Sequence, residues 1–373
     1  MMKLDLEVRC PVQDTFRVQQ VAGMFDVPLG AESSERFCAE IPGEDEPWEI
    51  GLIVGPSGSG KSTIAREAFG ASLHCGSEWP DDRAVIDCFE ECGDPSVKEI
   101  VGLFTAVGFG SPPSWIKPYR VLSNGERFRC DLARALATGQ SHSTEDGENA
   151  PLVAFDEFTS VVDRNVAKVC SAAIAKGVRN GSIRTRFVAV TCHYDVADWL
   201  EPDWVLDMAM GSLQRRRLRR PKIELEVSRC SVEAWRLFVR HHYLTGSLAP
   251  QACCYMATWN GEPVSFAATL PVIAQKGRRR FTRIVTLPDY QGIGIGMRFV
   301  GAVAQLNRDE GRRINVTSSH PSLIRHCQRS PLWRAVGVKK TGQGSSRNRS
   351  AFPKYRASTG RAVVSFEYIG ETT

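Results

Sequence analysis

A chain of 373 residues is longer than one ordinary hydrophobic core requires, and this length predicts two or three domains. Its composition, 42% hydrophobic and 24% charged, is globular and excludes a wholly disordered, collagen-like or coiled-coil chain. The charge is split: residues 1–213 carry −14 (19 basic, 33 acidic) and residues 214–373 carry +19 (28 basic, 9 acidic). We interpret the halves as domains with different partners. The basic half is a candidate for binding a polyanion, or for docking against the acidic half.

The twelve cysteines are scattered along the chain and include no Cys-x-x-Cys pair. Most lie in apolar stretches, which favours free thiols in a reducing compartment over disulfides or a zinc site. The N-terminal sequence MMKLDLEVRC alternates polar and apolar residues and lacks the apolar region of a signal peptide. No stretch approaches the roughly 18 apolar residues of a membrane span. We therefore expect a soluble, cytoplasmic protein.

The first domain, expected over residues 1–213, has the pattern of an α/β protein with a largely parallel sheet. Residues 1–48 predict two or three antiparallel strands, and residues 140–150 predict a polar loop. Later strands are expected at Glu49–Val54, Leu152–Phe155, Phe187–Thr191 and Trp204–Met208, with a further candidate at Arg83–Phe89. Helices are expected at residues 62–70 and Glu126–Thr138, ending at Gly70 and Gly139.

A basic linker at residues 214–222 (QRRRLRRPK) separates this domain from a second one, expected over residues 223–373. Strands and helices alternate in the second domain, which predicts an α+β fold. Its elements are expected at residues 223–227 (strand), 232–243 (helix), 255–270 (a hairpin turning at Asn260-Gly261), 281–287 (strand), 297–308 (helix), 312–317 (strand), 321–328 (helix) and 333–338 (strand). Residues 341–349 are expected to form a flexible loop.

The sequence GPSGSGKST at residues 55–63 fits the pattern G-x-x-x-x-G-K-[ST], between an apolar strand and a helix. Its glycines let successive backbone N–H groups surround phosphates, and the helix N-terminus adds positive potential. Lys61 is expected to reach the β- and γ-phosphates of ATP, and Ser62 to bind Mg²⁺. The expected nucleotide contacts are Gly55, Ser57, Gly58, Gly60, Lys61, Ser62 and Thr63. The alternative is a glycine-rich turn that binds nothing.

Two adjacent carboxylates end the apolar run Leu152-Val-Ala-Phe-Asp156-Glu157. At the end of a buried strand, Asp156 is placed to hold Mg²⁺ or its water ligands. Glu157 is placed to polarise an attacking water, a role that a hydrolase requires. The pair is common by itself, and its position downstream of the glycine-rich loop makes it specific.

A third motif, Leu122-Ser-Asn-Gly-Glu126, precedes the helical sequence RFRCDLARALA. With the two motifs above, it resembles the ABC-type ATPase family over roughly residues 20–210. The resemblance implies that Ser123 and Gly125 contact the γ-phosphate held by another protomer's glycine-rich loop. ATP would therefore join two copies head to tail as a homodimer.

The same resemblance extends to two later segments. Thr159–Asp163 resembles the family's D-loop, which implies a role for Asp163 at the nucleotide. Thr191-Cys-His193 resembles the segment that carries the switch histidine, so His193 would contact the γ-phosphate and the attacking water. Glu157, His193 and Lys61 are then the candidate catalytic residues.

Two departures from the family are evident. Only 62 positions separate Lys61 from Ser123, and this stretch contains no glutamine for the family's Q-loop; Asp87 or Glu90 is the candidate substitute. A short helical region and no membrane segment favour a soluble ATPase over a transporter subunit. The aromatic side chain that stacks on adenine stays open among Phe25, Phe37 and Trp48, with Phe25 the first choice.

In the second domain, Gln291–Gly296 (QGIGIG) lies between a predicted strand and a predicted helix. It resembles the pyrophosphate-binding motif of GNAT acetyltransferases, [RQ]-x-x-G-x-[GA]. The resemblance implies a GNAT-like fold that binds acetyl-CoA or a related acyl-CoA, with the backbone of Val285 and Leu287 facing the pantetheine arm. The loop contacts would come from Gln291, Gly292, Ile293, Gly294, Ile295 and Gly296. The alternative is a plain tight turn.

No general base for such a transferase stands out in the sequence. Candidate polar groups are Ser319, His320, His326 and Cys327, and the segment His241-His242-Tyr243. That segment and the basic strand GRRRFTRIV faintly resemble the Mom-type phage DNA-modification proteins, which have a GNAT-like fold. A histidine pair that caps a helix is the alternative.

Arginine runs supply much of the positive charge, at residues 215–220, 278–280 and 312–313. Arginine suits bidentate phosphate contacts, whereas a solvated surface explains any single run equally well. The leading hypothesis is an ABC-type ATPase fused to a GNAT-like acyltransferase that acts on DNA or RNA. The alternatives are a nucleic-acid-binding ATPase whose second domain is inactive, and an ATP-gated protein or small-molecule acetyltransferase.

Overall fold

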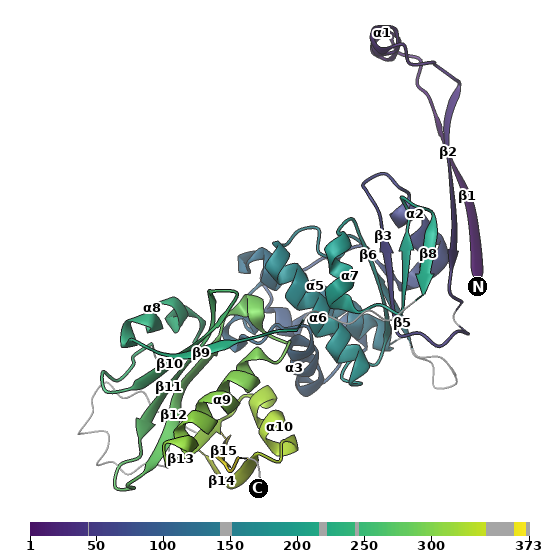
Figure 1. Ribbon diagram of the computed structural model, residues 1–373. Coiled ribbons are helices and arrows are strands. Elements are labelled where there is room, and N and C mark those ends of the chain that lie inside the picture. The colour runs from purple at the N-terminus through teal and green to yellow at the C-terminus, as the bar shows by residue number, and fades with distance from the viewer. Residues whose placement is uncertain (44, 142–150, 216–221, 243–245, 341–361, 371–373) are drawn as a thin grey trace. The chain divides into compact units, whose positions relative to one another are not determined.

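The structure is a computed structural model that describes residues 1–43, 45–141, 151–215, 222–242, 246–340 and 362–370. The chain forms two compact units, each a mixture of helices and sheet (Figure 1). Unit 1 contains Met1–Leu103 and Ser123–Arg220, and unit 2 contains Phe104–Leu122 and Pro221–Thr373. The sequence had placed residues 104–122 in the first domain. They pack with unit 2 instead, although both of their ends continue into unit 1.

Unit 1 is built on a six-stranded sheet whose first five strands are parallel, and a buried apolar run forms each of its central strands. Across the sheet the strands are β4 (Leu73–His74), β5 (Leu152–Phe155), β6 (Arg186–Thr191), β3 (Ile50–Val54), β7 (Trp204–Asp207) and β8 (Ser212–Arg215). Only β8 runs antiparallel, and it pairs with β7. Because β6 lies between β3 and β5, the loops that follow these three strands leave the same edge of the sheet.

The helices of unit 1 have clear local causes. Ser123 caps the helix after it and accepts from the amide of Glu126 as Glu126 accepts from the amide of Ser123, a capping box. Asp163 caps the next helix by accepting from the amides of Asn165 and Val166. The helices that begin in unit 1 are α1 (Phe16–Phe25), α2 (Lys61–Phe69), α3 (Val97–Ala106), α5 (Asn124–Ser141), α6 (Arg164–Arg179) and α7 (Ala197–Leu200).

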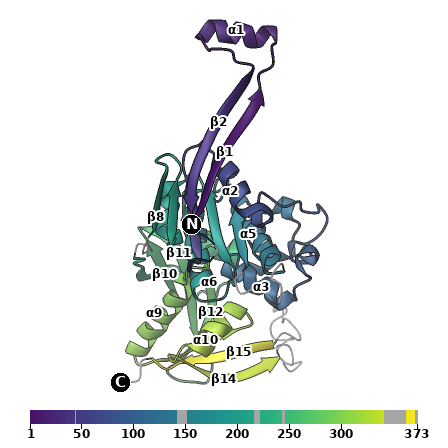
Figure 2. The same cartoon turned by 90° about the vertical axis from the view of Figure 1, so that its right-hand side faces the viewer.

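The first 41 residues form two antiparallel strands, as the sequence predicted, but a helix separates them. Strands β1 (Met2–Pro11) and β2 (Glu32–Ile41) pair along ten residues each, and α1 lies at the far end of this hairpin (Figure 2). The helix exposes apolar side chains, among them Phe16 and Phe25. Near the sheet, Ala39 and Ile41 of β2 are buried in the core of unit 1.

Two sequence expectations for unit 1 are wrong. Arg83–Phe89 forms no strand; Val85–Asp87 is a single 3₁₀ turn, and β4 is the strand that borders β5. Gly139 does not end its helix, because α5 continues to Ser141. A Cβ atom at Gly139 would lie 2.3 Å from a methyl carbon of Val153 on β5, so this glycine permits close helix–strand packing.

Unit 2 is built on a seven-stranded mixed sheet. Across the sheet the strands are β14 (Trp333–Lys340), β15 (Ala362–Tyr368), β13 (Arg313–Ser318), β12 (Arg278–Thr286), β11 (Glu262–Pro271), β10 (Cys253–Trp259) and β9 (Glu226–Cys230). The turn between β10 and β11 is the predicted one, with Asn260 and Gly261 both at positive φ. All neighbours are antiparallel except β12 and β13.

Three helices, α8 (Trp235–Phe238), α9 (Ile295–Asp309) and α10 (Pro321–Arg329), follow the second-domain boundary, and α4 (Pro112–Trp115) belongs to the inserted segment. The predicted helix at residues 232–243 is mostly short 3₁₀ turns around α8, and the predicted strand at 223–227 begins only at Glu226. The sequence did not predict β15, which inserts between β13 and β14.

Several expectations fall outside the described residues: most of the acidic loop at 140–150, most of the basic linker at 214–222, the tail at 341–349, and Tyr243. All twelve cysteines are free thiols, six of them buried, whereas Cys10, Cys38 and Cys75 are exposed. Within the part of the chain that the structure describes, no helix is both long enough and apolar enough to cross a membrane.

Helical glycines of unit 1 give a matched test of the packing. We predict that Gly139→Ala destabilises the protein by about 1–3 kcal/mol, because the added methyl group overpacks against Val153. Gly102→Ala in α3 should instead stabilise by about 0.5–1 kcal/mol, since a Cβ there meets nothing within 4 Å. Urea denaturation of both variants measures the difference. Equal effects of the two substitutions would contradict the close packing of α5 on β5.

Candidate functional site

The glycine-rich loop of unit 1 follows β3 and leads into α2. Gly58 and Gly60 have φ angles of 80° and 81°, a left-handed conformation that glycine adopts without strain. Gly60 is the N-cap of α2 and no side chain caps the helix, so the first amides of α2 are left for another acceptor. The side chain of Lys61, 8% exposed, folds back over the loop and donates to the carbonyl of Pro56 at 2.7 Å. This arrangement is suited to an anion such as a phosphate.

The two residues expected to bind Mg²⁺ lie together. Ser62 Oγ donates to Asp156 Oδ1 at 3.1 Å, and the amide of Glu157 donates to the same carboxylate oxygen at 2.9 Å. The amide of Asp156 donates to the carbonyl of His74 on β4, which fixes the end of β5. Hydroxyl and carboxylate oxygens are the donors that Mg²⁺ prefers, so this pair fits the ion.

The segment after Asp156 is strained. Glu157 and Thr159 both have positive φ, at 51° and 69°, a rare conformation for residues with a β-carbon and most costly for β-branched threonine. Thr159 Oγ1 lies 3.2 Å from Nδ1 of His193, which follows β6. Burial, followed by the charge of Arg164, lowers the pKa of His193, so its ring is neutral at pH 7. The exposed carboxylate of Glu157 accepts from Ser160 Oγ.

The remaining expected nucleotide contacts lie at helix starts. Ser123 precedes α5 and caps it, and Gly125 lies in the first turn of that helix. Asp163 is the N-cap of α6. Their contact with a nucleotide held by a second protomer stays a prediction. Of the two candidates for the missing glutamine, Glu90 is ion-paired with Arg83 and Asp87 presents its carbonyl to the same guanidinium.

The structure distinguishes the three candidate aromatics for adenine. Phe25 lies in α1 with 69% of its surface exposed, at the far end of the β1–β2 hairpin. Trp48 is buried in the core, edge-on to Trp204. Phe37 of β2 lies directly against the loop, since a Cβ atom at Gly60 would lie 2.3 Å from its ring. Phe37 is therefore the candidate next to the anion site, and Phe25 is not.

The glycine-rich loop of unit 2 repeats this geometry. Gly292 and Gly294 have φ angles of 92° and 95°, and Gly294 is the N-cap of α9 with no side chain capping the helix. Within the first turn of α9, a Cβ atom at Gly296 would lie 2.5 Å from Oγ1 of Thr286 on β12. The helix therefore starts close to the strand with its first amides left for an acceptor.

Strand β12 separates from β13 beside this loop. The two strands pair only at Arg278, Arg279 and Arg280, and β12 continues to Thr286 paired with β11 alone. The carboxyl-terminal half of β12 therefore has backbone groups directed at the gap. Such a gap between parallel strands, next to an anion-binding loop, can accept an extended amide-containing chain.

The backbone groups that face the gap differ from those that the sequence predicts. The amide of Leu287 donates to Val264 of the β11 side, and the carbonyl of Val285 accepts from Ser265. Both expected pantetheine contacts are therefore directed away from the gap. Because backbone groups alternate along a strand, those of Ile284 and Thr286 point toward it instead. A shift of one residue in the register of β12 against β11 reverses the direction of these backbone groups. The glycine-rich motif alone does not set that register.

Gln291, the first residue of the motif, holds the loop in place. Its amide nitrogen donates to the carbonyl of Thr286 at 2.8 Å, and its amide oxygen accepts from the backbone N–H of Gly110 at 2.9 Å. The carbonyl of Gly110 lies 3.4 Å from Nε2 of His320. Burial lowers the pKa of His320, whose ring also lies near that of Trp115. The inserted segment is thus fixed to the Gln291–Gly296 loop, a contact that sequence reasoning missed.

The other candidate bases are less suited to proton transfer. Burial raises the pKa of the Cys327 thiol to about 12, so it stays protonated at pH 7. His242 packs edge-on against Trp235, and His241 accepts from Arg240 at the end of a 3₁₀ turn. These contacts agree with the structural alternative for the histidine pair. Nothing in the sequence or the described residues singles out a general base.

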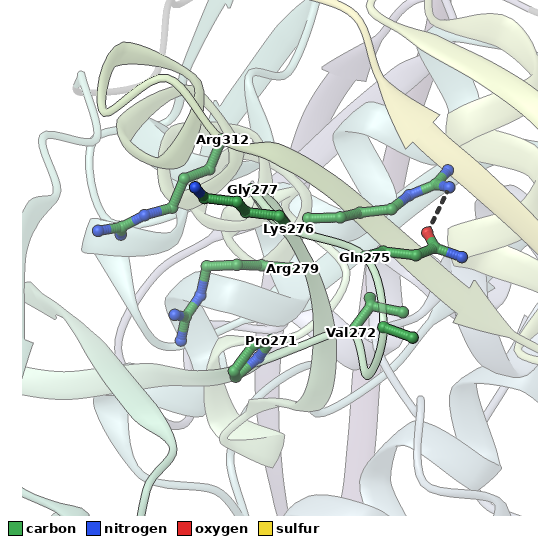
Figure 3. Close-up of a pocket in the computed structure, with 9 residues that line it drawn as sticks. Pro271, Val272, Gln275, Lys276, Gly277, Arg279 and Arg312 are labelled. Atoms are coloured by element: carbon green, nitrogen blue, oxygen red, sulfur yellow. Dashed lines mark hydrogen bonds between the residues drawn. The ribbon is translucent and has the colours of Figure 1, made fainter.

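The arginine run at 278–280 borders a pocket of about 490 Å³ at the tip of the β11–β12 hairpin (Figure 3). Its lining residues are Pro271, Val272, Ala274, Gln275, Lys276, Gly277, Arg278, Arg279 and Arg312. Arg279 and Arg312 extend on one side of the loop, and Gln275 lies on the other. The pocket is basic, with four cationic side chains and no acidic one in its lining.

No protein-family model matches this sequence, and no curated protein matches it. The chain is similar to the ribosomal-protein-S18-alanine N-acetyltransferase from Escherichia coli, with 14% identity over 40% of this chain and 97% of that chain, at a TM-score of 0.31. The IAA acetyltransferase from Bacillus cereus ATCC 14579 is 14% identical over 39% of this chain and 99% of that chain, at a TM-score of 0.30.

A bacterial Atm1-family ABC exporter with ATP bound is 21% identical over 46% of this chain, at a TM-score of 0.33. The match spans 34% of the exporter's length. All three TM-scores lie below 0.5, so these are partial similarities that assign no function to the chain.

Proposed function

We propose that this protein is an ATPase coupled to an acyl-CoA-dependent transferase whose acceptor is a nucleic acid. One observation carries the proposal. Two helices, α2 in unit 1 and α9 in unit 2, begin at left-handed glycines in the glycine-rich loops that follow β3 and β12, and neither has a side-chain cap. Each is a candidate phosphate site, and each lies within a motif of matching chemistry.

In unit 1, the amides of residues 58–63 and the amine of Lys61 would hold the β- and γ-phosphates of ATP. Ser62 and Asp156 would hold Mg²⁺, which supplies positive charge against the triphosphate. Glu157 would accept a proton as water oxygen bonds to the γ-phosphorus and the bond to the leaving ADP oxygen breaks. His193, neutral and held by Thr159, would orient that water.

In unit 2, the first amides of α9 would bind the pyrophosphate of acyl-CoA, and the gap beyond the β12–β13 pairing would take the pantetheine arm. The backbone N–H and C=O of Ile284 and the N–H of Thr286 are the candidates for hydrogen bonds to that arm, since the Thr286 carbonyl already accepts from Gln291. An acceptor nitrogen or oxygen would bond to the thioester carbonyl carbon, the C–S bond would break, and CoA would leave as the thiol.

The inserted segment supports coupling between the two activities. Residues 104–122 end directly before Ser123, the residue expected to meet a second protomer's nucleotide, and Gly110 of this segment is hydrogen-bonded to Gln291. A change of unit 1 on ATP binding would reach the acyl-CoA loop through this covalent connection. The positive charge of the second half supports a nucleic acid as the acceptor.

The acceptor is testable in cells. We predict that mass spectrometry of digested DNA and RNA finds an acyl-modified nucleoside only in cells that express the protein. A Glu157→Gln variant should reduce the yield of the modified nucleoside, since coupling of the two activities requires ATP hydrolysis. Unmodified nucleic acid, together with acylated protein or small molecules, would overturn the nucleic-acid acceptor and leave the transferase chemistry standing.

Hydrolysis is predicted to depend on Glu157. Glu157→Gln should lower ATP turnover by about 10²–10⁴-fold while Mg-ATP still binds, because Lys61, Ser62 and Asp156 are unchanged. Trapped ATP should then drive dimerisation, measured by light scattering. Glu67→Gln on the exposed side of α2 is the matched control and should hydrolyse ATP at the parent rate. Parent-rate hydrolysis by Glu157→Gln would remove this carboxylate from the mechanism.

Binding of acyl-CoA is predicted to depend on Gly294. Gly294→Val should abolish acetyl-CoA binding in calorimetry, because a side chain would stand where the pyrophosphate meets α9. Gly311→Val is the matched control, since Gly311 has a similar positive φ of 74° but open space around it. The Gly311→Val substitution imposes comparable backbone strain in the same unit, and the variant should bind acetyl-CoA normally. Equal binding by both variants would contradict the site.

A further inference from the structure

Glu367 is a buried carboxylate with three arginine partners. Its side chain is 6% exposed and accepts from Arg313, with Nε to Oε1 at 2.6 Å and Nη2 to Oε2 at 3.0 Å. Arg334 and Arg278 reach Oε2 of the same carboxylate at 3.4 Å and 3.6 Å. We call these four residues the Glu367 cluster; they come from the neighbouring strands β12, β13, β15 and β14.

The Glu367 cluster carries a net positive charge. One guanidinium neutralises one carboxylate, so three of them leave an excess of two positive charges. The bidentate contact of Arg313 already holds the pKa of Glu367 below its usual value. The side chains of Arg313 and Arg334 are 63% and 62% exposed, and their contacts with Glu367 use one or two of the five N–H donors on each. Both guanidinium groups therefore have N–H donors that Glu367 does not use.

Two of the three arginines of the cluster, Arg278 and Arg313, are held by several hydrogen bonds each. Besides its contact with Glu367, Arg278 donates to Asn315 Oδ1 and to Gln275 Oε1, both at 2.9 Å. Arg313 is fixed by its two parallel hydrogen bonds. A guanidinium that is already ordered loses less conformational entropy when it binds an anion. These guanidinium groups are therefore preorganised for binding a phosphate, in addition to attracting it by charge.

Register places further cations on the same face of the sheet. Arg278 pairs with Arg313, Arg280 pairs with Asn315, and Asn315 pairs with Glu367, so these side chains share one face. Arg280 is exposed. From β12 to β14 there are three strand spacings, or about 14 Å, which measured along the axis of a B-form duplex is the rise of roughly four phosphates of one strand.

The hairpin pocket continues this surface. Arg278 belongs to both the Glu367 cluster and the pocket, where Lys276, Arg279 and Arg312 add three more cations (Figure 3). Arg279 is held by two hydrogen bonds to Thr269. Arg278 lies on the face of the Glu367 cluster, whereas Arg279 and Arg312 extend on the other side of the hairpin, and Arg312 is also ion-paired with Glu310. The combined surface is thus a basic array that continues from the sheet face around the tip of the hairpin. A single small anion would engage only part of it.

We propose that the Glu367 cluster and the adjoining pocket bind the phosphate backbone of the nucleic acid on which the transferase acts. This inference rests on the proposed function for the identity of the partner. A chain of regularly spaced phosphates matches the array in charge and in length, and planar guanidinium groups suit bidentate phosphate contact. The contact is to the backbone, so it positions the nucleic acid and does not select its sequence.

The test measures binding of the full-length protein to a short DNA duplex, the same single strand, and an RNA of equal sequence, by fluorescence anisotropy. Arg313→Gln combined with Arg334→Gln should weaken binding about 10- to 100-fold at low salt. It should also reduce the slope of log K against log salt by roughly 1.8, or about 0.9 for each lost phosphate contact on B-DNA. Binding of acetyl-CoA should be unchanged, since neither residue lies at the Gly292–Gly296 loop.

Two controls keep this result interpretable. Arg229→Gln combined with Arg236→Gln makes the same change of net charge at exposed arginines elsewhere in unit 2, on β9 and α8, and should leave the slope nearly unchanged. Arg334→Gln alone is the variant least disruptive to the fold, because Arg334 lies on the edge strand β14 and makes one long contact with Glu367. It should reduce the slope by about 0.9.

The possible outcomes separate the two proposals. Equal weakening by both double variants would show a diffuse charge effect, and would overturn the cluster as the site while leaving a nucleic acid as the partner. Undiminished binding by the Arg313 and Arg334 double variant would do the same. If the parent protein binds none of the three nucleic acids, the acceptor in the proposed function fails, and this inference fails with it.

Discussion

Both candidate sites depend on one constraint: the start of an α-helix leaves its first amide groups without acceptors inside the helix. Elsewhere this chain meets the constraint with side chains, since Ser123 and Glu126 cap α5 and Asp163 caps α6. At α2 and α9 the capping residue is a glycine, which brings no acceptor. The helices α4, α7, α8 and α10 also lack a side-chain cap, so an uncapped end alone does not mark a ligand site. Among the helices whose N-cap the structure describes, α2 and α9 are distinguished by a left-handed glycine at that position, which lets a ligand approach the first amides closely.

The rest of each site is arranged around a glycine at the start of the helix, which is the N-cap Gly60 in unit 1 and Gly296 of the first turn in unit 2. In unit 1, Phe37 lies against Gly60, and Ser62 of the first turn reaches Asp156 across the sheet edge. In unit 2, Thr286 lies against Gly296, and its carbonyl holds Gln291. A β-carbon at either glycine would separate the helix from its neighbour. The same requirement for close approach therefore positions an aromatic ring in one unit and a strand end in the other.

Local signals made much of this predictable. Both glycine-rich loops, the strands that precede them and the pair Asp156-Glu157 are contiguous patterns, and residue type and spacing alone are enough to locate them. Gly139 was misread because a glycine that permits packing against Val153 has the same local appearance as one that ends a helix. Arg83–Phe89 is apolar enough for a strand, but only Ala84 forms an isolated bridge, and the chain then turns into the 3₁₀ turn at Val85–Asp87.

Non-local features were not predictable. The direction of the backbone groups of Val285 and Leu287 depends on which residue of β11 lies opposite, so a register shift of one residue reverses it. The packing of residues 104–122 with unit 2 depends on a hydrogen bond between Gly110 and Gln291, which are 181 positions apart. No periodicity in either segment encodes such a pairing.

The distribution of charge in the second half is another feature that the sequence alone does not reveal. The +19 of the second half is visible in the sequence, but it does not say which arginines are already neutralised. Arg229 and Arg312 share Glu310, and Arg236 pairs with Glu233, so these cations have nearby carboxylates. Only nine acidic residues are available in this half, and one of them, Glu367, is buried among three guanidinium groups by a strand that the sequence did not reveal. A buried carboxylate that orders more cations than it neutralises turns a diffuse excess of charge into a surface with defined donors, and defined donors are what recognition of a phosphate backbone requires.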